Sequence, residues 1–209
     1  MTAIRHVSFD LDGTLVDSFG VMRQSWEEAT RKLGITCGFE SYRRYVGLPF
    51  DTILATIGLT SYRNELAELY FEGTRSRQDK IRKIEGADDL LRKCRQRGVG
   101  VSIITSKPSS NAAPLLEELN IDVDTLICAD EVAKGKPDPQ SALLLCAEIK
   151  LRPEEILYVC DMVFDLQFAL NAGMQFILFE NEGRNRMPAN LLNRVERVPT
   201  LAAIADILS

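Results

Sequence analysis

Three carboxylates lie within the segment Val7–Ser18, directly after a short apolar-rich run of chain. Asp10 and Asp12 are two residues apart, so in extended chain both side chains lie on the same side. Gly13 follows them and permits a sharp turn that a residue with a β-carbon would resist. Because like charges this close repel each other, the sequence predicts that something positive neutralises them.

Residues that could do chemistry also follow three later strands. Thr105 and Ser106 offer hydroxyls and backbone N–H groups just before a predicted helix, whose N-terminus suits an anion. Lys136 lies in a loop that prolines stiffen, and Asp161 and Asp165 begin another helix. In an open parallel sheet, ligands bind beyond the carboxyl ends of the strands. Converging carboxylates favour Mg²⁺, and the hydroxyls and the lysine beside it would complete a phosphate site.

The elements that must position these residues alternate between strand and helix. The predicted strands are Arg5–Leu11, Val99–Thr105, Val123–Ala129, Ile156–Asp161 and Met174–Glu180. The predicted helices are Ala87–Arg97, Ser110–Leu119, Pro139–Ile149, Phe164–Ala172 and Thr200–Leu208, the last with Thr200 as its cap. This alternation predicts an α/β fold with a Rossmann-like parallel sheet covered by helices on both faces.

One long interruption separates the first strand from the rest of this pattern. Residues 18 to about 82 have helical spacing of apolar positions and no comparable strand signal. Unstructured loops of such length are uncommon, so we expect an inserted all-helical cap domain. The predicted domains are residues 1–17 with 84–209 as the core and 18–83 as the cap, with hinges near Val16–Phe19 and Lys80–Gly86.

Composition limits the class of protein. The 209 residues are 45% hydrophobic and 26% charged, as in an ordinary globular protein. The net charge of −5 gives no general attraction to nucleic acid or anionic membranes, so a small molecule is the expected partner. Five cysteines without a C-x-x-C pair indicate free thiols and a cytoplasmic location, and no apolar run is long enough to span a membrane. The choice between monomer and homodimer stays open.

At the strand ends described above, the sequence resembles the haloacid dehalogenase superfamily of phosphatases. Within this superfamily it resembles the phosphoglycolate phosphatase-like branch, which has a helical cap. The four segments that carry the resemblance are Phe9–Ser18, Ile104–Pro108, Gly135–Pro139 and Cys160–Asp161 with Asp165. They occur in the family's order, each at the end of a predicted strand or in the loop after one. The resemblance extends from about Arg5 to Gly173 and places the cap where the family usually has it.

The resemblance implies a hydrolytic mechanism at the first segment. Asp10 would attack phosphorus to form an aspartyl-phosphate, and Asp12 would protonate the leaving oxygen and later deprotonate the attacking water. Mg²⁺ would be held by Asp10, by the backbone carbonyl of Asp12 and by Asp161. Gly13 and Thr14 would support this turn.

The resemblance also implies the remaining site residues. Thr105 and the backbone N–H of Ser106 would hold phosphate oxygens, and Lys136 would balance the charge of the nucleophile and the phosphoryl group. Asp165 would support Lys136 or a metal-bound water. The flanks of Asp161 depart from the family pattern, because Cys160 stands where Gly is usual and Met162 where Ser or Thr is common.

The residues favour a phosphatase of small phosphomonoesters over three other functions. A phosphosugar mutase of the β-phosphoglucomutase type has Val at the position of Thr14 and His at that of Met22, so both residues favour hydrolysis. A dehalogenase would lack the second aspartate, Asp12. A binding protein on the same fold should have lost one of the central residues. The physiological substrate, whether phosphoglycolate-like, a sugar phosphate or a nucleotide, stays open.

We expect a structural role for three further residues and contact with the substrate for three others. Asp17 and Ser18 are expected to cap the first helix of the cap domain. His6, the only histidine, lies inside the first strand and is expected to be packed there. Arg43 and Arg44, with Tyr45, are the candidates for contact with the leaving group of the substrate.

Overall fold

A six-stranded parallel sheet forms the larger part of the computed structural model, which describes residues 3–180 and 195–208. Its strand order is β5-β4-β1-β6-β7-β8. The strands are β1 His6–Phe9, β4 Gly100–Ile104, β5 Thr125–Ile127, β6 Ile156–Cys160, β7 Gln175–Phe179 and β8 Arg197–Val198. β1 lies between β4 and β6 and pairs in parallel with both, so its carboxyl end lies in the middle of the sheet edge.

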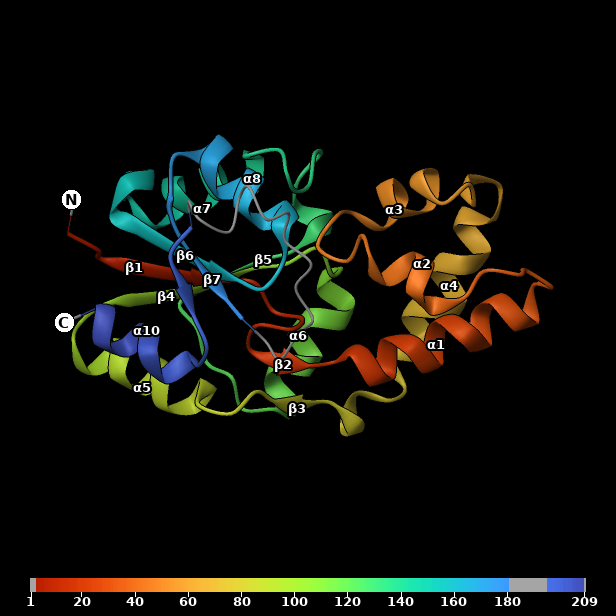
Figure 1. The fold of residues 1–209 in the computed structure, drawn as a ribbon, viewed down its shortest axis with the longest axis horizontal. Helices are drawn as coiled ribbons and strands as arrows, with labels where there is room; N and C mark the ends of the chain where they lie inside the picture. The colour runs from red at the N-terminus through yellow and green to blue at the C-terminus, as the bar shows by residue number, and fades with distance from the viewer. Residues whose placement is uncertain (1–2, 181–194, 209) are drawn as a thin grey trace.

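Helices cover both faces of this sheet, as the alternating pattern predicts. Figure 1 shows α7 and α8 on one face and α5 and α10 on the other, with both chain ends far from the inserted helices. The helices of this part are α5 Ala87–Gln96, α6 Ser109–Glu118, α7 Gln140–Ile149, α8 Val163–Ala172 and α10 Leu201–Ile207. Because both faces are covered, the central strands β1 and β6 are buried throughout.

The sequence-based boundaries of these elements are confirmed to within two residues. Thr200 caps α10 as expected, since its Oγ1 accepts a hydrogen bond of 3.3 Å from the backbone N–H of Ala203. β8, a strand of two residues, was not predicted from the sequence. Residues 181–194 and 209 of the predicted core range lie outside the described residues.

The insertion after β1 is helical and packs around its own apolar cluster. It contains α1 Phe19–Lys32, α2 Phe39–Arg43, α3 Phe50–Thr56 and α4 Arg63–Arg75. At its centre Trp26 is fully buried, stacks on Tyr42 at 4.4 Å between ring centroids, and donates a hydrogen bond of 2.9 Å to the carbonyl of Cys37. This cluster is separate from the clusters against the sheet, which confirms an all-helical cap on an α/β core.

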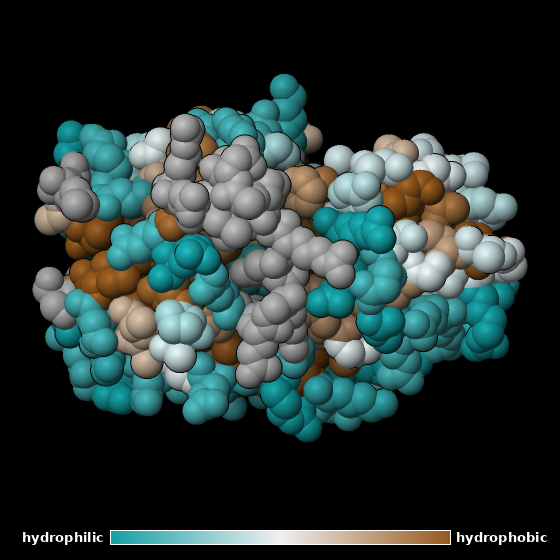
Figure 2. Space-filling model, viewed as in Figure 1, coloured by the Kyte–Doolittle hydropathy of each residue, from teal (hydrophilic) through white to brown (hydrophobic). Residues whose placement is uncertain are grey.

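The chain enters and leaves the cap through a two-stranded antiparallel ribbon. β2, Val16–Asp17, pairs with β3, Arg82–Lys83, and this second small sheet was not predicted. The ribbon supports the predicted division at residues 17 and 84, which stays a prediction. Figure 2 shows mainly hydrophilic residues along the edge where α5 and α1 lie, as expected for exposed helix faces. Among the described residues, no helix is long and apolar enough to cross a membrane.

Candidate active site

The predicted site residues come together at the carboxyl edge of the sheet. Asp10 follows β1, and its backbone N–H donates to the carbonyl of Val159 at 2.9 Å, which continues the β1–β6 ladder. Thr105 follows β4 on one side of β1, and Asp161 follows β6 on the other. Asp10 therefore lies between a hydroxyl and a second carboxylate because of strand order alone.

Lys136 joins two of the carboxylates. Its Nζ donates to Asp10 Oδ1 at 2.7 Å and to Asp165 Oδ1 at 2.8 Å, and its side chain is 2% exposed. Burial alone would lower the pKa of Lys136, but the two carboxylates outweigh burial and raise it above the ordinary value. Lys136 is therefore a fixed positive charge at the site. The hydroxyl of Tyr158 on β6 also donates to Asp165 Oδ1, at 2.9 Å, a contact that the sequence did not predict.

One lysine does not neutralise the acid cluster. Burial raises the pKa of Asp10 to about 7; Lys136 opposes the rise, and the nearby Asp165 adds to it. Burial, followed by the charges of Asp10 and Asp165, raises the pKa of Asp161 well above its usual range. The residues alone therefore disfavour having every carboxylate ionised, and a further positive charge would relieve this cost.

The surroundings of Asp161 fit a small hard cation. Oδ1 accepts a hydrogen bond of 3.3 Å from Thr14, whereas the buried Oδ2 has no hydrogen-bond partner among the described residues. A β-carbon at Gly13 would overlap this Oδ2, so glycine keeps the space beside it open. The part of the chain that the structure describes holds no group of three Asp, Glu, His or Cys side chains placed to bind a metal. Mg²⁺ usually takes only one or two protein carboxylates and keeps several waters, which suits this donor set.

Asp12 has two partners that sequence reasoning missed. Lys107 Nζ lies 3.0 Å from Asp12 Oδ1 and 2.9 Å from Oδ2, and the hydroxyl of Ser18 donates to Oδ1. Ser18 does occupy the N-cap position of α1, but its side chain makes no capping hydrogen bond there. The predicted capping role of Ser18 is therefore wrong, because the buried Asp12 carboxylate takes its hydroxyl instead.

The turn after β4 links the core to the cap. Thr105 Oγ1 accepts a hydrogen bond of 3.1 Å from the backbone N–H of Lys107, and the Ser106 hydroxyl donates to the carbonyl of Gly47 at 2.6 Å. Gly47 has a φ of +105°, and a β-carbon there would lie 3.2 Å from Asp165 Oδ2. The cap loop at Gly47 thus lies directly over the acid cluster.

Two pockets lie where the cap faces the core. The smaller, of about 40 Å³, is lined by Asp10 and Asp12 of the core and by cap residues that include Tyr42 and Tyr70. The larger, of about 300 Å³, is lined by Thr105 and Lys136, and neither Asp10 nor Asp12 reaches it.

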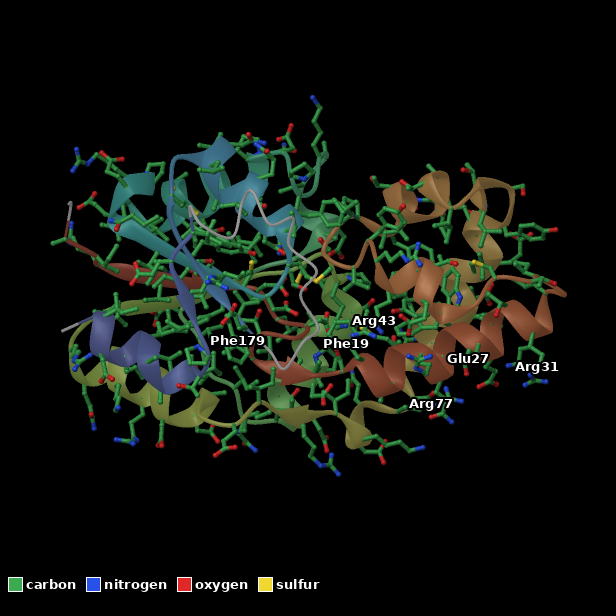
Figure 3. The ribbon with its side chains drawn as sticks, viewed as in Figure 1. Phe19, Glu27, Arg31, Arg43, Arg77 and Phe179 are labelled. Carbon is green, nitrogen blue, oxygen red and sulfur yellow. The ribbon has the colours of Figure 1, made fainter. Side chains whose placement is uncertain are left out.

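The cap arginines expected to contact substrate line neither pocket. The Arg43 guanidinium lies 5.5 Å from the centre of the Phe19 ring (Figure 3) and forms an ion pair with Glu40 at 3.5 Å. Arg44 is exposed, and Tyr45 packs against Phe164 of α8 with ring centroids 6.3 Å apart. In this arrangement the cap residues that line the small pocket with Asp10 are uncharged.

The prediction that His6 is packed within its strand is confirmed, and Cys160 beside Asp161 is buried as well. His6 is buried in the central strand β1, and burial lowers its pKa to about 4, so it is a packed neutral residue. Cys160 is fully buried, and burial followed by the charges of Asp165 and Asp161 raises the pKa of its thiol well above the usual range. A thiol held protonated in this way is a structural residue rather than a second nucleophile.

The chain belongs to the haloacid dehalogenase-like hydrolase family, whose model matches residues 7–179, and it is therefore an enzyme. It is 30% identical over 188 residues to a phosphoglycolate phosphatase of Pseudomonas putida, covering 84% of this chain and 69% of the relative. It is 28% identical to a validoxylamine A 7'-phosphate phosphatase of Streptomyces hygroscopicus, covering 79% and 81%. A hydrolase structure from Pseudomonas syringae superposes with a TM-score of 0.82 at 25% identity, covering 93% of this chain and 92% of the other.

Proposed function

We propose that this enzyme is a Mg²⁺-dependent phosphatase of small phosphomonoesters that works through an aspartyl-phosphate on Asp10. The observation that carries this proposal is the buried contact of Asp10 with Lys136 at the sheet edge. Beside it, Oδ2 of Asp161 and Oδ2 of Asp165 have no hydrogen-bond partner among the residues that the structure describes. The relatives named as phosphatases of phosphoglycolate and of validoxylamine A 7'-phosphate support the same reaction class.

In the first half-reaction an oxygen of the Asp10 carboxylate attacks phosphorus and the ester P–O bond breaks. Asp12 gives a proton to the leaving oxygen, because it is the other carboxyl group that reaches the small pocket. Lys136 keeps Asp10 oriented and offsets negative charge during the attack. Thr105 and the Ser106 backbone N–H hold the non-reacting phosphate oxygens.

In the second half-reaction a water attacks the aspartyl-phosphate. Asp12 now takes a proton from this water, inorganic phosphate leaves, and Asp10 is regenerated. Asp165 holds Lys136 in place through both halves, and the hydroxyl of Tyr158 holds Asp165. A bound Mg²⁺, held by Asp10, the Asp12 carbonyl and Asp161, would supply the positive charge that this carboxylate cluster lacks.

Transfer of the phosphoryl group to a second sugar hydroxyl, as in a mutase, is less well supported. The small pocket contains Met22 where the mutase resemblance would require histidine, and the only histidine of the chain, His6, is packed within β1. Hydrolysis needs no such residue, because water is the acceptor. The five cysteines are all free in the structure, which is the basis for proposing a cytoplasmic location.

The experiment is a panel of phosphomonoesters, assayed for released phosphate with and without Mg²⁺. We expect Mg²⁺-dependent release from small esters, and borohydride trapping during turnover should label Asp10 at its side chain. A sugar 1-phosphate that is isomerised without release of phosphate would indicate the mutase instead. The absence of release from every ester in the presence of Mg²⁺ would refute the proposed function.

A further inference from the structure

The hydroxyl of Tyr158 and the ammonium of Lys136 donate to the same oxygen atom of Asp165. Tyr158 Oη lies 2.9 Å from Asp165 Oδ1, and Lys136 Nζ lies 2.8 Å from it. The other oxygen, Oδ2, is buried and has no hydrogen-bond partner among the described residues. Two donors on Oδ1 fix the plane of this carboxylate, whereas a single donor would let it turn and present Oδ2 to Lys136.

Tyr158 remains a hydrogen-bond donor under all ordinary conditions. Burial, followed by the charges of Asp165 and Asp10, raises the pKa of Tyr158 well above its usual value, so the hydroxyl keeps its proton. Two acceptors lie within reach of this proton, Asp165 Oδ1 at 2.9 Å and the carbonyl of Ile104 at 3.4 Å. Hydrogen bonds to charged acceptors are shorter and roughly twice as strong as neutral ones, so the proton is shared with Asp165.

The ring of Tyr158 contacts Lys136 directly. Lys136 Nζ lies 5.4 Å from the centre of the Tyr158 ring and 5.8 Å from that of Phe168, and the two rings meet edge to face at 5.1 Å. A cation within about 6 Å of a ring centre is attracted to the face of the ring. The ammonium is therefore enclosed by two carboxylates and two rings that all attract it.

The position of Lys136 depends on the balance between its two carboxylates. Nζ lies 2.7 Å from Asp10 and 2.8 Å from Asp165, so it is shared almost equally. Asp165 is fully buried, where a carboxylate that loses one donor attracts the remaining donor more strongly. Without the Tyr158 hydroxyl, Lys136 would be drawn toward Asp165 and away from Asp10, the proposed nucleophile.

We propose that Tyr158 is a positioning residue of the reaction, whose hydroxyl acts through Asp165 to keep Lys136 at Asp10. This inference rests on the proposed phosphatase function. Every residue of β6 is buried, and phenylalanine would fill the same space as Tyr158, so packing alone does not require the hydroxyl. If the hydroxyl had only a structural role, its removal would change stability and leave turnover unaffected.

The kinetic test compares Tyr158→Phe with wild type, because this variant removes the hydroxyl and keeps the ring. With p-nitrophenyl phosphate or 2-phosphoglycolate and Mg²⁺, kcat should fall about tenfold while KM changes less than about twofold. In the Asp165→Asn background, the same change should lower kcat less than about twofold, because the hydroxyl acts through Asp165. Tyr62→Phe, which removes an exposed phenol from the cap, is the matched control and should change neither constant.

A second measurement needs no turnover. In ¹H–¹⁵N spectra the ammonium of Lys136, identified by its loss in Lys136→Met, should be protected from exchange with water because the side chain is 2% exposed. Tyr158→Phe should shift this signal, and Tyr62→Phe should leave it in place.

An unchanged kcat in folded Tyr158→Phe would show that the hydroxyl only satisfies a buried carboxylate, and would overturn the inference. Equal losses of kcat in the wild-type and Asp165→Asn backgrounds would overturn it as well, as would an unmoved Lys136 signal. If no phosphomonoester is hydrolysed, the proposed function fails, whereas the Lys136 signal still shows whether Tyr158 places the ammonium. The two failures can therefore be told apart.

Discussion

Replacing the nucleophile Asp10 by asparagine should abolish turnover and, at the same time, make the metal-free protein more stable. Asparagine keeps the shape of the side chain but forms no acyl-phosphate, so phosphate release should be lost. The gain in stability follows from burial, which raises the pKa of Asp10 from 3.8 to about 7 even with Lys136 beside it. The ionised carboxylate is therefore a net cost to the folded state when no metal is bound.

The size of this cost in free energy of unfolding follows from the pKa shift of Asp10. One pKa unit corresponds to about 1.4 kcal/mol, so a rise from 3.8 to about 7 gives a ceiling of about 4 kcal/mol at pH 8. Relaxation and water around a buried charge reduce such penalties, and we expect a gain of about 2 kcal/mol for Asp10→Asn. Because the folded-state pKa of Asp10 is raised, the free energy of unfolding of the wild type falls as pH rises from about 4 to about 7. The free energies of unfolding of wild type and variant should therefore converge near pH 4.

The assay is urea unfolding followed by circular dichroism, in EDTA at pH 8 and at pH 5. The difference between Asp10→Asn and wild type should be larger at pH 8, and added Mg²⁺ should stabilise the wild type more than the variant. Asp206→Asn, at an exposed position on α10, is the control and should stay within about 0.5 kcal/mol of wild type. An Asp10→Asn variant that is less stable than wild type at pH 8 in EDTA would refute the reasoning, as would retained turnover.

Two further predictions concern the cation and the cap. EDTA should remove phosphatase activity and Mg²⁺ should restore it, whereas Ca²⁺ should restore little because its longer, less regular coordination misplaces the attacking carboxylate; full activity in metal-free buffer would contradict this. Trp26→Ala should lower the free energy of unfolding by about 3–5 kcal/mol, measured by urea unfolding, because this fully buried ring stacks on Tyr42 at the centre of the cap. Trp26→Phe should lose less, and a loss below about 1 kcal/mol for Trp26→Ala would show that the cap is not packed around this residue.

The positions of the site residues could be predicted because the ends of strands depend on local patterns. Asp10, Thr105 and Asp161 each follow a buried strand, and parallel strands bring their carboxyl ends to one edge. Lys136 lies in the loop after β5, and the family resemblance indicated that it would approach Asp10. The fold and the main contacts of the site could therefore be predicted from the sequence.

Two of the contacts that were missed join segments far apart in the chain. Lys107 reaches Asp12 across 95 positions, and the Ser106 hydroxyl reaches the Gly47 carbonyl across 59. No periodic pattern encodes such pairs, because they depend on how two loops approach each other. The side of α2 that faces the core could not be predicted for a related reason, since this helix has only five residues; the expected substrate contact of Arg43 stays a prediction.

The β2–β3 ribbon has a consequence for how this enzyme could be diversified. Because Val16 pairs with Lys83 and Asp17 with Arg82, the peptide leaving the core and the peptide returning to it are neighbours. A foreign helical bundle whose ends are equally close could be grafted between them without altering sheet order, and the acid cluster would remain on the recipient. Chimeras built at this junction would exchange the cap and keep the catalytic residues of the core.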